Sequence, residues 1–323
     1  MLQYLVILLD ETGTSYCHYE NKSVKPCLMP LDILREGIIF GMKENLMIQF
    51  VYPDYDLPQE YKDLIETIDH SKIMTSSNAK EADVVVFNDV TTLASCNIDY
   101  SKSVVLRVSK ENIFEQSTII ESIIGKVKRL NIVITDIESL EKDDYEKYHE
   151  VLIAWSKQLA HLYAKGESPQ INILTDRIML DSMNNCGAGE KSVTLAPDGN
   201  FYVCPAFYHV GDEEDFGLGK SKFNIGSLKE GLKIINPKLY QLEFAPICNA
   251  CDAFHCNRCV WLNRKMTYEI NTPSKQQCVV SHIERNASMF LLEEIRKNTK
   301  MFESKIIQEI DYYDPLEKIL NKL

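Results

Sequence analysis

Seven of the chain's ten cysteines lie between residues 186 and 278, and their spacing constrains the fold more than any other feature. The pattern is Cys-x12-Gly-x4-Cys, a gap, then Cys-x2-Cys-x4-Cys-x2-Cys-x18-Cys, formed by Cys186, Gly199, Cys204, Cys248, Cys251, Cys256, Cys259 and Cys278. Thiolates are soft ligands for zinc and iron–sulfur clusters, and a Cys-x2-Cys loop lets two sulfurs bind one centre. Seven thiolates are too many for one tetrahedral metal and one short of filling two four-ligand clusters.

The composition limits the partners and the compartment. A net charge of −12 argues against nucleic acid and against an anionic membrane surface, because both bind basic faces. The apolar run at residues 4–9 ends at Asp10 and lacks the basic start and cleavage site of a signal peptide. No segment approaches the roughly 18 apolar residues that cross a bilayer. We therefore expect a cytoplasmic protein whose cysteines stay reduced, which favours metal ligation over disulfides.

The first half of the chain alternates strand-like and helix-like segments. Short apolar runs rich in β-branched residues predict six strands buried on both faces, at residues 4–9, 47–52, 83–87, 103–108, 131–135 and 170–174. The polar connection 69–82 is expected to be exposed. Apolar residues recur at helical spacing after Pro30, at Leu31, Leu34, Ile38 and Met42. The clearest helical stripe comprises Tyr145, Tyr148, Leu152, Trp155, Leu159 and Leu162.

This alternation predicts an α/β domain with a parallel sheet at residues 1–176, either an open doubly wound sheet or a partial (β/α)6 barrel. From residue 177, turn residues and cysteines replace the strand and helix signals. We expect a small Cys-rich metal-binding domain at 177–285. A small domain with little apolar core usually needs a bound metal to stay folded. C-terminal helices are expected at 286–323. Their pattern begins with Ile283, Ala287, Leu291 and Ile295, and a last amphipathic segment follows Pro315.

Cys248-x2-Cys251 and Cys256-x2-Cys259 form two knuckles four residues apart. A single zinc ion bound by these four thiolates would leave no role for Cys186, Cys204 and Cys278. Zinc knuckles are also usually separated by a longer hairpin, whereas closely spaced cysteines with a distant one are typical of iron–sulfur sites. The spacing therefore favours iron–sulfur clusters, with zinc in one or both positions as the alternative.

The whole pattern resembles the SPASM domain, which follows the barrel in many radical-SAM peptide-modifying enzymes. The first half matches it, and residues 225–228 (Ile-Gly-Ser-Leu) are similar to a turn often found there, while two later spacings are one residue short. The resemblance implies two [4Fe–4S] clusters, one bound by Cys186, Cys204 and Cys259 and one by Cys248, Cys251, Cys256 and Cys278. An eighth ligand would be absent, leaving an open iron site, or would come from Asp198, His209, Asp252 or His255. Such residues beside cysteines more often hydrogen-bond to the ligands.

A radical-SAM enzyme also carries Cys-x3-Cys-x2-Cys after its first strand, and this chain lacks it. In the corresponding loop, Cys17 matches the middle cysteine, but Gly13 and Glu20 stand where the other two belong. The Gly-Gly-Glu motif expected after the second strand is absent as well, since residues 52–58 read Tyr-Pro-Asp-Tyr-Asp-Leu-Pro. We therefore expect a degenerate radical-SAM barrel that binds no S-adenosylmethionine.

This combination resembles the CXXX repeat peptide maturase family, whose members are expected to act beside a true radical-SAM enzyme and a precursor peptide with Cys-x-x-x repeats. The resemblance implies an accessory iron–sulfur protein in the maturation of a ribosomally synthesised peptide, which relays electrons or docks the peptide and is non-catalytic or co-catalytic. One alternative is a zinc-stabilised peptide- or protein-binding module without a redox role. Another is an independent enzyme on the α/β domain, although no Gly-rich phosphate loop follows its first strand.

Overall fold

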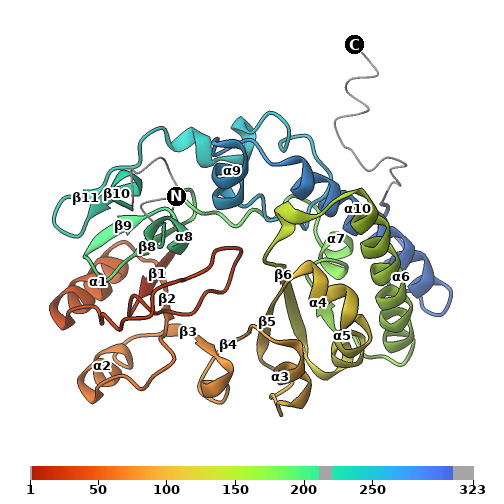
Figure 1. Ribbon diagram of the computed structural model, residues 1–323, viewed down its shortest axis with the longest axis horizontal. Coiled ribbons are helices and arrows are strands. Elements are labelled where there is room, and N and C mark those ends of the chain that lie inside the picture. The colour runs from red at the N-terminus through yellow and green to blue at the C-terminus, as the bar shows by residue number, and fades with distance from the viewer. Residues whose placement is uncertain (1, 211–219, 308–323) are drawn as a thin grey trace. The chain divides into compact units, whose positions relative to one another are not determined.

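The computed structural model of the chain describes residues 2–210 and 220–307 (Figure 1). The chain forms two compact units, each assembled from two separate stretches of sequence. The first unit combines Met1–Val86 with Gly187–Ala245, and the second combines Phe87–Cys186 with Pro246–Leu323. The division 1–176, 177–285 and 286–323 stays a prediction, and its amphipathic segment after Pro315 lies outside the described residues.

The first unit is built on a mostly parallel sheet with the strand order β11-β10-β9-β8-β1-β2-β3-β4. Strands β8, β1, β2, β3 and β4 are parallel, whereas β9, β10 and β11 extend the sheet by antiparallel pairing. The strands are β1 (Tyr4–Leu8), β2 (Met47–Val51), β3 (His70–Thr75), β4 (Val84–Phe87), β8 (Ser192–Leu195), β9 (Asn200–Tyr202), β10 (Asn224–Ser227) and β11 (Gly231–Leu232). Because β1, β2 and β3 are parallel, the loops that follow them leave the sheet at one edge.

Strand β3 corrects the expectation of an exposed connection at residues 69–82. Its backbone is fully paired between β2 and β4, and Ile73 and Met74 are buried. Its polar side chains gave no strand pattern in the sequence, but they have local partners. The His70 ring makes an edge contact with Phe50, and Lys72 pairs with Glu66. A strand with satisfied polar side chains costs little in the middle of a sheet, so composition alone did not reveal it.

Helix α1 (Leu31–Lys43) begins after Pro30 as predicted, but it meets the sheet through glycines as well as through the apolar stripe. Leu34 and Ile38 are buried, whereas Met42 is 62 % exposed and so is not a core residue. A Cβ placed on Gly37 would lie 2.3 Å from Cδ2 of Leu195. A side chain at Gly37 would therefore require the Leu195 side chain to move. The other helices of this unit are α2 (Gln59–Ile65) and α8 (Pro205–Tyr208).

The second unit contains three parallel strands in the order β5-β6-β7: β5 (Ser103–Val108), β6 (Arg129–Ile134) and β7 (Gln170–Ile171). Along β6, Leu130, Ile132 and Ile134 are buried, while the alternate positions are half-buried and begin with Arg129 and Asn131. This period of two gives the strand one apolar face and one polar face. The helices are α3 (Val90–Ser95), α4 (Lys110–Glu115), α5 (Ser117–Ile123), α6 (Lys142–Ala164), α7 (Thr175–Met179), α9 (Val260–Thr267) and α10 (Lys275–Arg296).

Helices α6 and α10 lie side by side and form the core of the second unit (Figure 1). Each buries the stripe that the sequence predicts: Tyr148 and Trp155 are 1 % and 0 % exposed on α6, and Ala287 and Leu291 are both 0 % exposed on α10. Among the described helices, none combines the length and apolar composition that a bilayer-spanning helix needs. The α/β class and the predicted stripes of α6 and α10 are confirmed.

Candidate metal centre

The two cysteine knuckles form an irregular loop, residues 248–259, which we call the knuckle loop and which leads into α9. Tight turns shape it, since the amide of Cys251 donates to the carbonyl of Cys248 and the amide of Cys256 donates to that of Ala253. Two further amides point at sulfur: Ala253 N lies 3.5 Å from Sγ of Cys251, and Arg258 N lies 3.4 Å from Sγ of Cys256. Amide donors to sulfur favour the thiolate form, which is the form that binds metal.

One face of α10 lies against the knuckle loop. Cys278, Ser281 and His282 share that face, because residues three and four apart are neighbours on a helix. The Nε2 atom of His282 is 3.4 Å from Sγ of Cys251, and the Ser281 hydroxyl is hydrogen-bonded to Cys256. Three of the predicted ligands thus belong to one neighbourhood in the second unit: Cys248, Cys251 and Cys256. Cys278 lies one turn before Ser281 and His282 on the helix face that meets them.

The electrostatics of this neighbourhood disfavour thiolates unless a cation is nearby. Burial, reinforced by the charge of Cys256, raises the pKa of the Cys248 thiol to about 12. Burial also raises the pKa values of Cys251 and Cys256, and it lowers the pKa of His282 to about 4. A bound metal cation would reverse the balance for the thiols. The donor types therefore fit a soft metal, although no three His, Cys, Asp or Glu side chains in residues 2–210 and 220–307 are already arranged around a metal position.

The first predicted cysteine, Cys186, also lies beside the knuckle loop. The amide of Cys186 donates to the carbonyl of Asn257 at 3.0 Å, and that of Asn184 donates to Phe254 at 2.8 Å. Cys186 therefore runs alongside the segment between Cys256 and Cys259.

Cys204 belongs to the first unit, where it follows β9 and precedes α8. The Gly199 of the cysteine pattern makes the β8–β9 turn with a φ of +76°, a conformation that favours glycine. Whether Cys204 shares a cluster with Cys186 and Cys259 stays a prediction.

All four suggested non-cysteine ligands have other partners, and His255 bonds to Glu284 through one ring nitrogen only. Asp252 pairs with Arg285 at 2.6 Å, and Asp198 accepts hydrogen bonds from Tyr202 Oη at 2.8 Å and Asn200 N at 3.1 Å. The ring of His209 is stacked on Tyr19, with 5.7 Å between centroids. Only His255, which lies inside the knuckle loop, is buried in the metal neighbourhood itself.

The sequence reasoning missed two residues of this neighbourhood, His282 and Glu284. Glu284 bonds to Nε2 of His255, and His282 contacts Cys251. The spacing of His282, four residues after Cys278 within a helical pattern, could have revealed it. The contacts of Glu284 depend on how α10 packs, so no sequence signal pointed to that residue.

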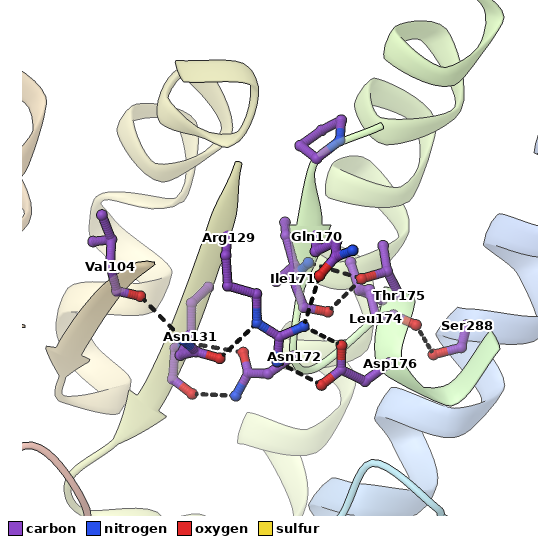
Figure 2. Close-up of polar contacts among 12 residues, drawn as sticks. Val104, Arg129, Asn131, Gln170, Ile171, Asn172, Leu174, Thr175, Asp176 and Ser288 are labelled. Atoms are coloured by element: carbon purple, nitrogen blue, oxygen red, sulfur yellow. Dashed lines mark hydrogen bonds and ion pairs between the residues drawn. The ribbon is translucent and has the colours of Figure 1, made fainter. Parts of the chain in front are cut away.

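Polar contacts tie α7 to the strands and to α10 (Figure 2). Arg129, at the start of β6, binds both carboxylate oxygens of Asp176, with Nη1–Oδ1 and Nη2–Oδ2 distances of 2.5 and 2.7 Å. The Asn172 side chain bonds to both backbone groups of Ile132, and the Ser288 hydroxyl of α10 donates to the carbonyl of Leu174 at 2.7 Å. This network fixes α7, the helix that carries Arg177.

Arg177 anchors the knuckle loop. Its guanidinium carbon lies 4.4 Å from the ring centroid of Phe254, and its Nη2 is 3.8 Å from Asp252. Arg285 of α10 binds the same aspartate from a second element. Two arginines from different helices therefore hold the middle of the loop, and this fixes the directions of the flanking cysteines.

The loop after β1 in the first unit is closed by its own hydrogen bonds. The buried carboxylate of Asp10 accepts from Thr12 N at 2.7 Å and from Tyr55 Oη at 2.7 Å. The Asn21 amide donates to the carbonyls of Glu11 and Gly13. These bonds hold the loop in a compact conformation across the carboxyl ends of β1 and β2.

The loop after β1 leaves little space for a side chain at position 13. A Cβ placed on Gly13 would be 3.2 Å from the carbonyl oxygen of Asp10, so a cysteine there would force the turn to shift. Glu20 is exposed, and Cys17 is half-buried. Of the three triad positions in this loop, 13, 17 and 20, only position 17 holds a cysteine.

Solved structures of anSMEcpe are similar to this chain over nearly its whole length. A structure titled with bound AdoMet has a TM-score of 0.60 at 12% identity and covers 93% of this chain and 97% of its own. One with AdoMet and the Cp18Cys peptide has a TM-score of 0.61 at 13% identity, covering 92% and 100%. One with AdoMet and the Kp18Cys peptide has a TM-score of 0.57 at 13% identity, covering 91% and 99%.

The fold is radical-SAM-like. At such low identity the similarity establishes the fold alone. No protein-family model matches the chain, and no curated protein matches it either.

Proposed function

We propose that this chain is an accessory iron–sulfur protein in the maturation of a ribosomally synthesised, cysteine-containing peptide. In this proposal a partial (β/α)6 barrel without its own S-adenosylmethionine site docks the peptide or a separate radical-SAM enzyme. The seven cysteines would hold two [4Fe–4S] clusters. When bound, such clusters supply one-electron transfer or an open iron site for a substrate thiolate.

One observation carries the proposal: a radical-SAM-like fold combined with a β1–α1 loop that has Gly13 and Glu20 in place of two triad cysteines. Hydrogen bonds of Asp10 with Tyr55 and of Asn21 with Glu11 and Gly13 order this loop. A chain that kept its cysteine pattern at 186–278 but lacks this triad is better suited to serve a radical generated by another protein.

Two further observations support the peptide role. Solved structures of anSMEcpe, whose fold is similar, contain the bound peptides Cp18Cys and Kp18Cys. In this chain, Cys251 and Cys256 each accept a hydrogen bond from a backbone amide of the knuckle loop, and Cys278 lies on the α10 face that carries Ser281 and His282. A soft metal would be held by these residues, while Arg177 and Arg285 fix the loop that carries two of them.

The decisive experiment is anaerobic purification followed by metal and sulfide analysis. We expect about eight irons and eight sulfides per chain and a broad absorption band at about 400 nm. Cys256→Ser should lower the iron content, whereas Cys96→Ser, at the end of α3 and outside the pattern, should not. A colourless protein containing only zinc would refute the iron–sulfur proposal and support the zinc-stabilised binding module.

A second experiment addresses the accessory role. The purified, iron-loaded chain is expected neither to bind S-adenosylmethionine in calorimetry nor to cleave it under reducing conditions. It is expected to bind a synthetic peptide with Cys-x-x-x repeats more tightly than the same peptide with serine at each cysteine. Reductive cleavage of S-adenosylmethionine by this chain alone would contradict the proposal.

A further inference from the structure

Three buried side chains form a hydrogen-bonded row beside the knuckle loop. The hydroxyl of Tyr148 on α6 donates to Oε1 of Glu284 on α10 at 2.7 Å. The other carboxylate oxygen of Glu284 is 3.0 Å from Nε2 of His255. The His255 and Glu284 side chains are only 2 % and 8 % exposed. Helices α6 and α10 thus hold one ring nitrogen of a histidine that belongs to the knuckle loop.

The row fixes the tautomer of His255. In the neutral imidazole, donation from Nε2 to the Glu284 carboxylate leaves the lone pair on Nδ1. In the described part of the chain, Nδ1 is buried and has no hydrogen-bond partner. Burying an acceptor without a hydrogen-bond partner costs the free energy of its desolvation. Such an atom therefore points to a missing ligand.

A histidine that binds metal through one ring nitrogen usually donates the other N–H to a carboxylate. His255 has this arrangement, and it lies in the sequence between Cys251 and Cys256. The contrast with Asp252 is informative, since both of its carboxylate oxygens face arginines. The cysteine pattern is also one ligand short of filling two four-ligand clusters.

We propose that Nδ1 of His255 is a metal ligand at the knuckle loop, with Glu284 and Tyr148 as its positioning residues. The inference rests on the proposed function only in that the loop binds a metal. The same imidazole nitrogen suits zinc and iron, and the test has an arm for each metal.

The test on iron-loaded protein needs no variant. Pulsed EPR of the reduced wild-type chain is expected to show a nitrogen strongly coupled to the cluster, which changes to the ¹⁵N pattern when the histidines are ¹⁵N-labelled. His255→Ala should abolish the coupling, whereas His282→Ala and the exposed His161→Ala should retain it. For zinc-loaded protein, X-ray absorption should show one nitrogen at about 2.0–2.1 Å besides sulfurs at about 2.3 Å.

The positioning role is tested with zinc alone and a competing chelator. Glu284→Gln should weaken zinc binding about 10–100-fold while the nitrogen signature remains. Metal bound without a coupled nitrogen, or a coupling that survives His255→Ala, would overturn this inference and leave the proposed function intact. Wild-type protein that binds neither iron nor zinc would overturn both.

Discussion

Removing the carboxylate of Asp176 tests how much the polar network of Figure 2 stabilises the second unit. Arg129 and Asp176 form a two-point ion pair whose side chains are 26 % and 11 % exposed. Breaking a fully buried pair costs about 3–5 kcal/mol, whereas exposed pairs contribute at most about 1 kcal/mol. Because Asp176 is nearly buried and Arg129 is partly solvated, we expect Asp176→Ala to lower the free energy of unfolding by about 2–3 kcal/mol.

Urea unfolding followed by circular dichroism measures this change, with the slope checked for constancy between variants. Glu230→Ala is the control, because it breaks an i,i+3 pair with Lys233 in which the side chains are 61 % and 63 % exposed. That control should cost less than about 0.5 kcal/mol. A double-mutant cycle with Arg129→Ala isolates the pair. Zero coupling, or a loss for Asp176→Ala no larger than for the control, would refute the reasoning.

Two further predictions concern the backbone and pH. Gly226→Ala should cost about 3 kcal/mol of unfolding free energy in the same assay, because φ is +124° and a Cβ would lie 2.0 Å from the carbonyl oxygen of Gly231. Gly231→Ala, at φ +76° with nothing within 4 Å, should cost only about 1 kcal/mol, and equal losses would contradict the argument. Hydrogen bonds from Thr91 and Thr92 lower the pKa of Asp89, the N-cap of α3, to about 2. Since this folded-state pKa is depressed, the stabilisation is complete above about pH 4 and is lost as the pH falls through about 2. Asp89→Ala should therefore be less stable than wild type at pH 5 and equal to it near pH 2, and a constant difference across that range would contradict the assignment.

The elements with strong periodicity could be predicted from sequence. The α6 stripe through Tyr148 and Trp155 and the α10 stripe through Leu291 are buried as expected, because a helix must hide a continuous apolar face. Strand β3 could not be predicted, since its polar residues carry no alternation and only pairing with β2 and β4 makes it a strand. Met42 fits the helical pattern but is exposed, because Gly37 and Gly41 bring α1 closest to the sheet on another face.

The sequence by itself determined the chemistry that this protein has available. Seven cysteines at fixed spacing predict soft metal ligation, and the absence of a triad around Cys17 predicts a barrel without its own cluster. Both predictions depend only on residue type and local spacing, which can be read from the sequence.

Only the tertiary structure decided which distant residues surround the cysteines. Ser281 and His282 meet the knuckle loop because α10 packs on α6, and Tyr148 reaches His255 through Glu284 for the same reason. The Tyr148–Glu284 contact joins residues 136 positions apart, and the contacts of His282 and Glu284 with the knuckle loop span 31 and 29 positions. They depend on how two helices bury their apolar stripes against each other, and no local pattern in the chain encodes that arrangement.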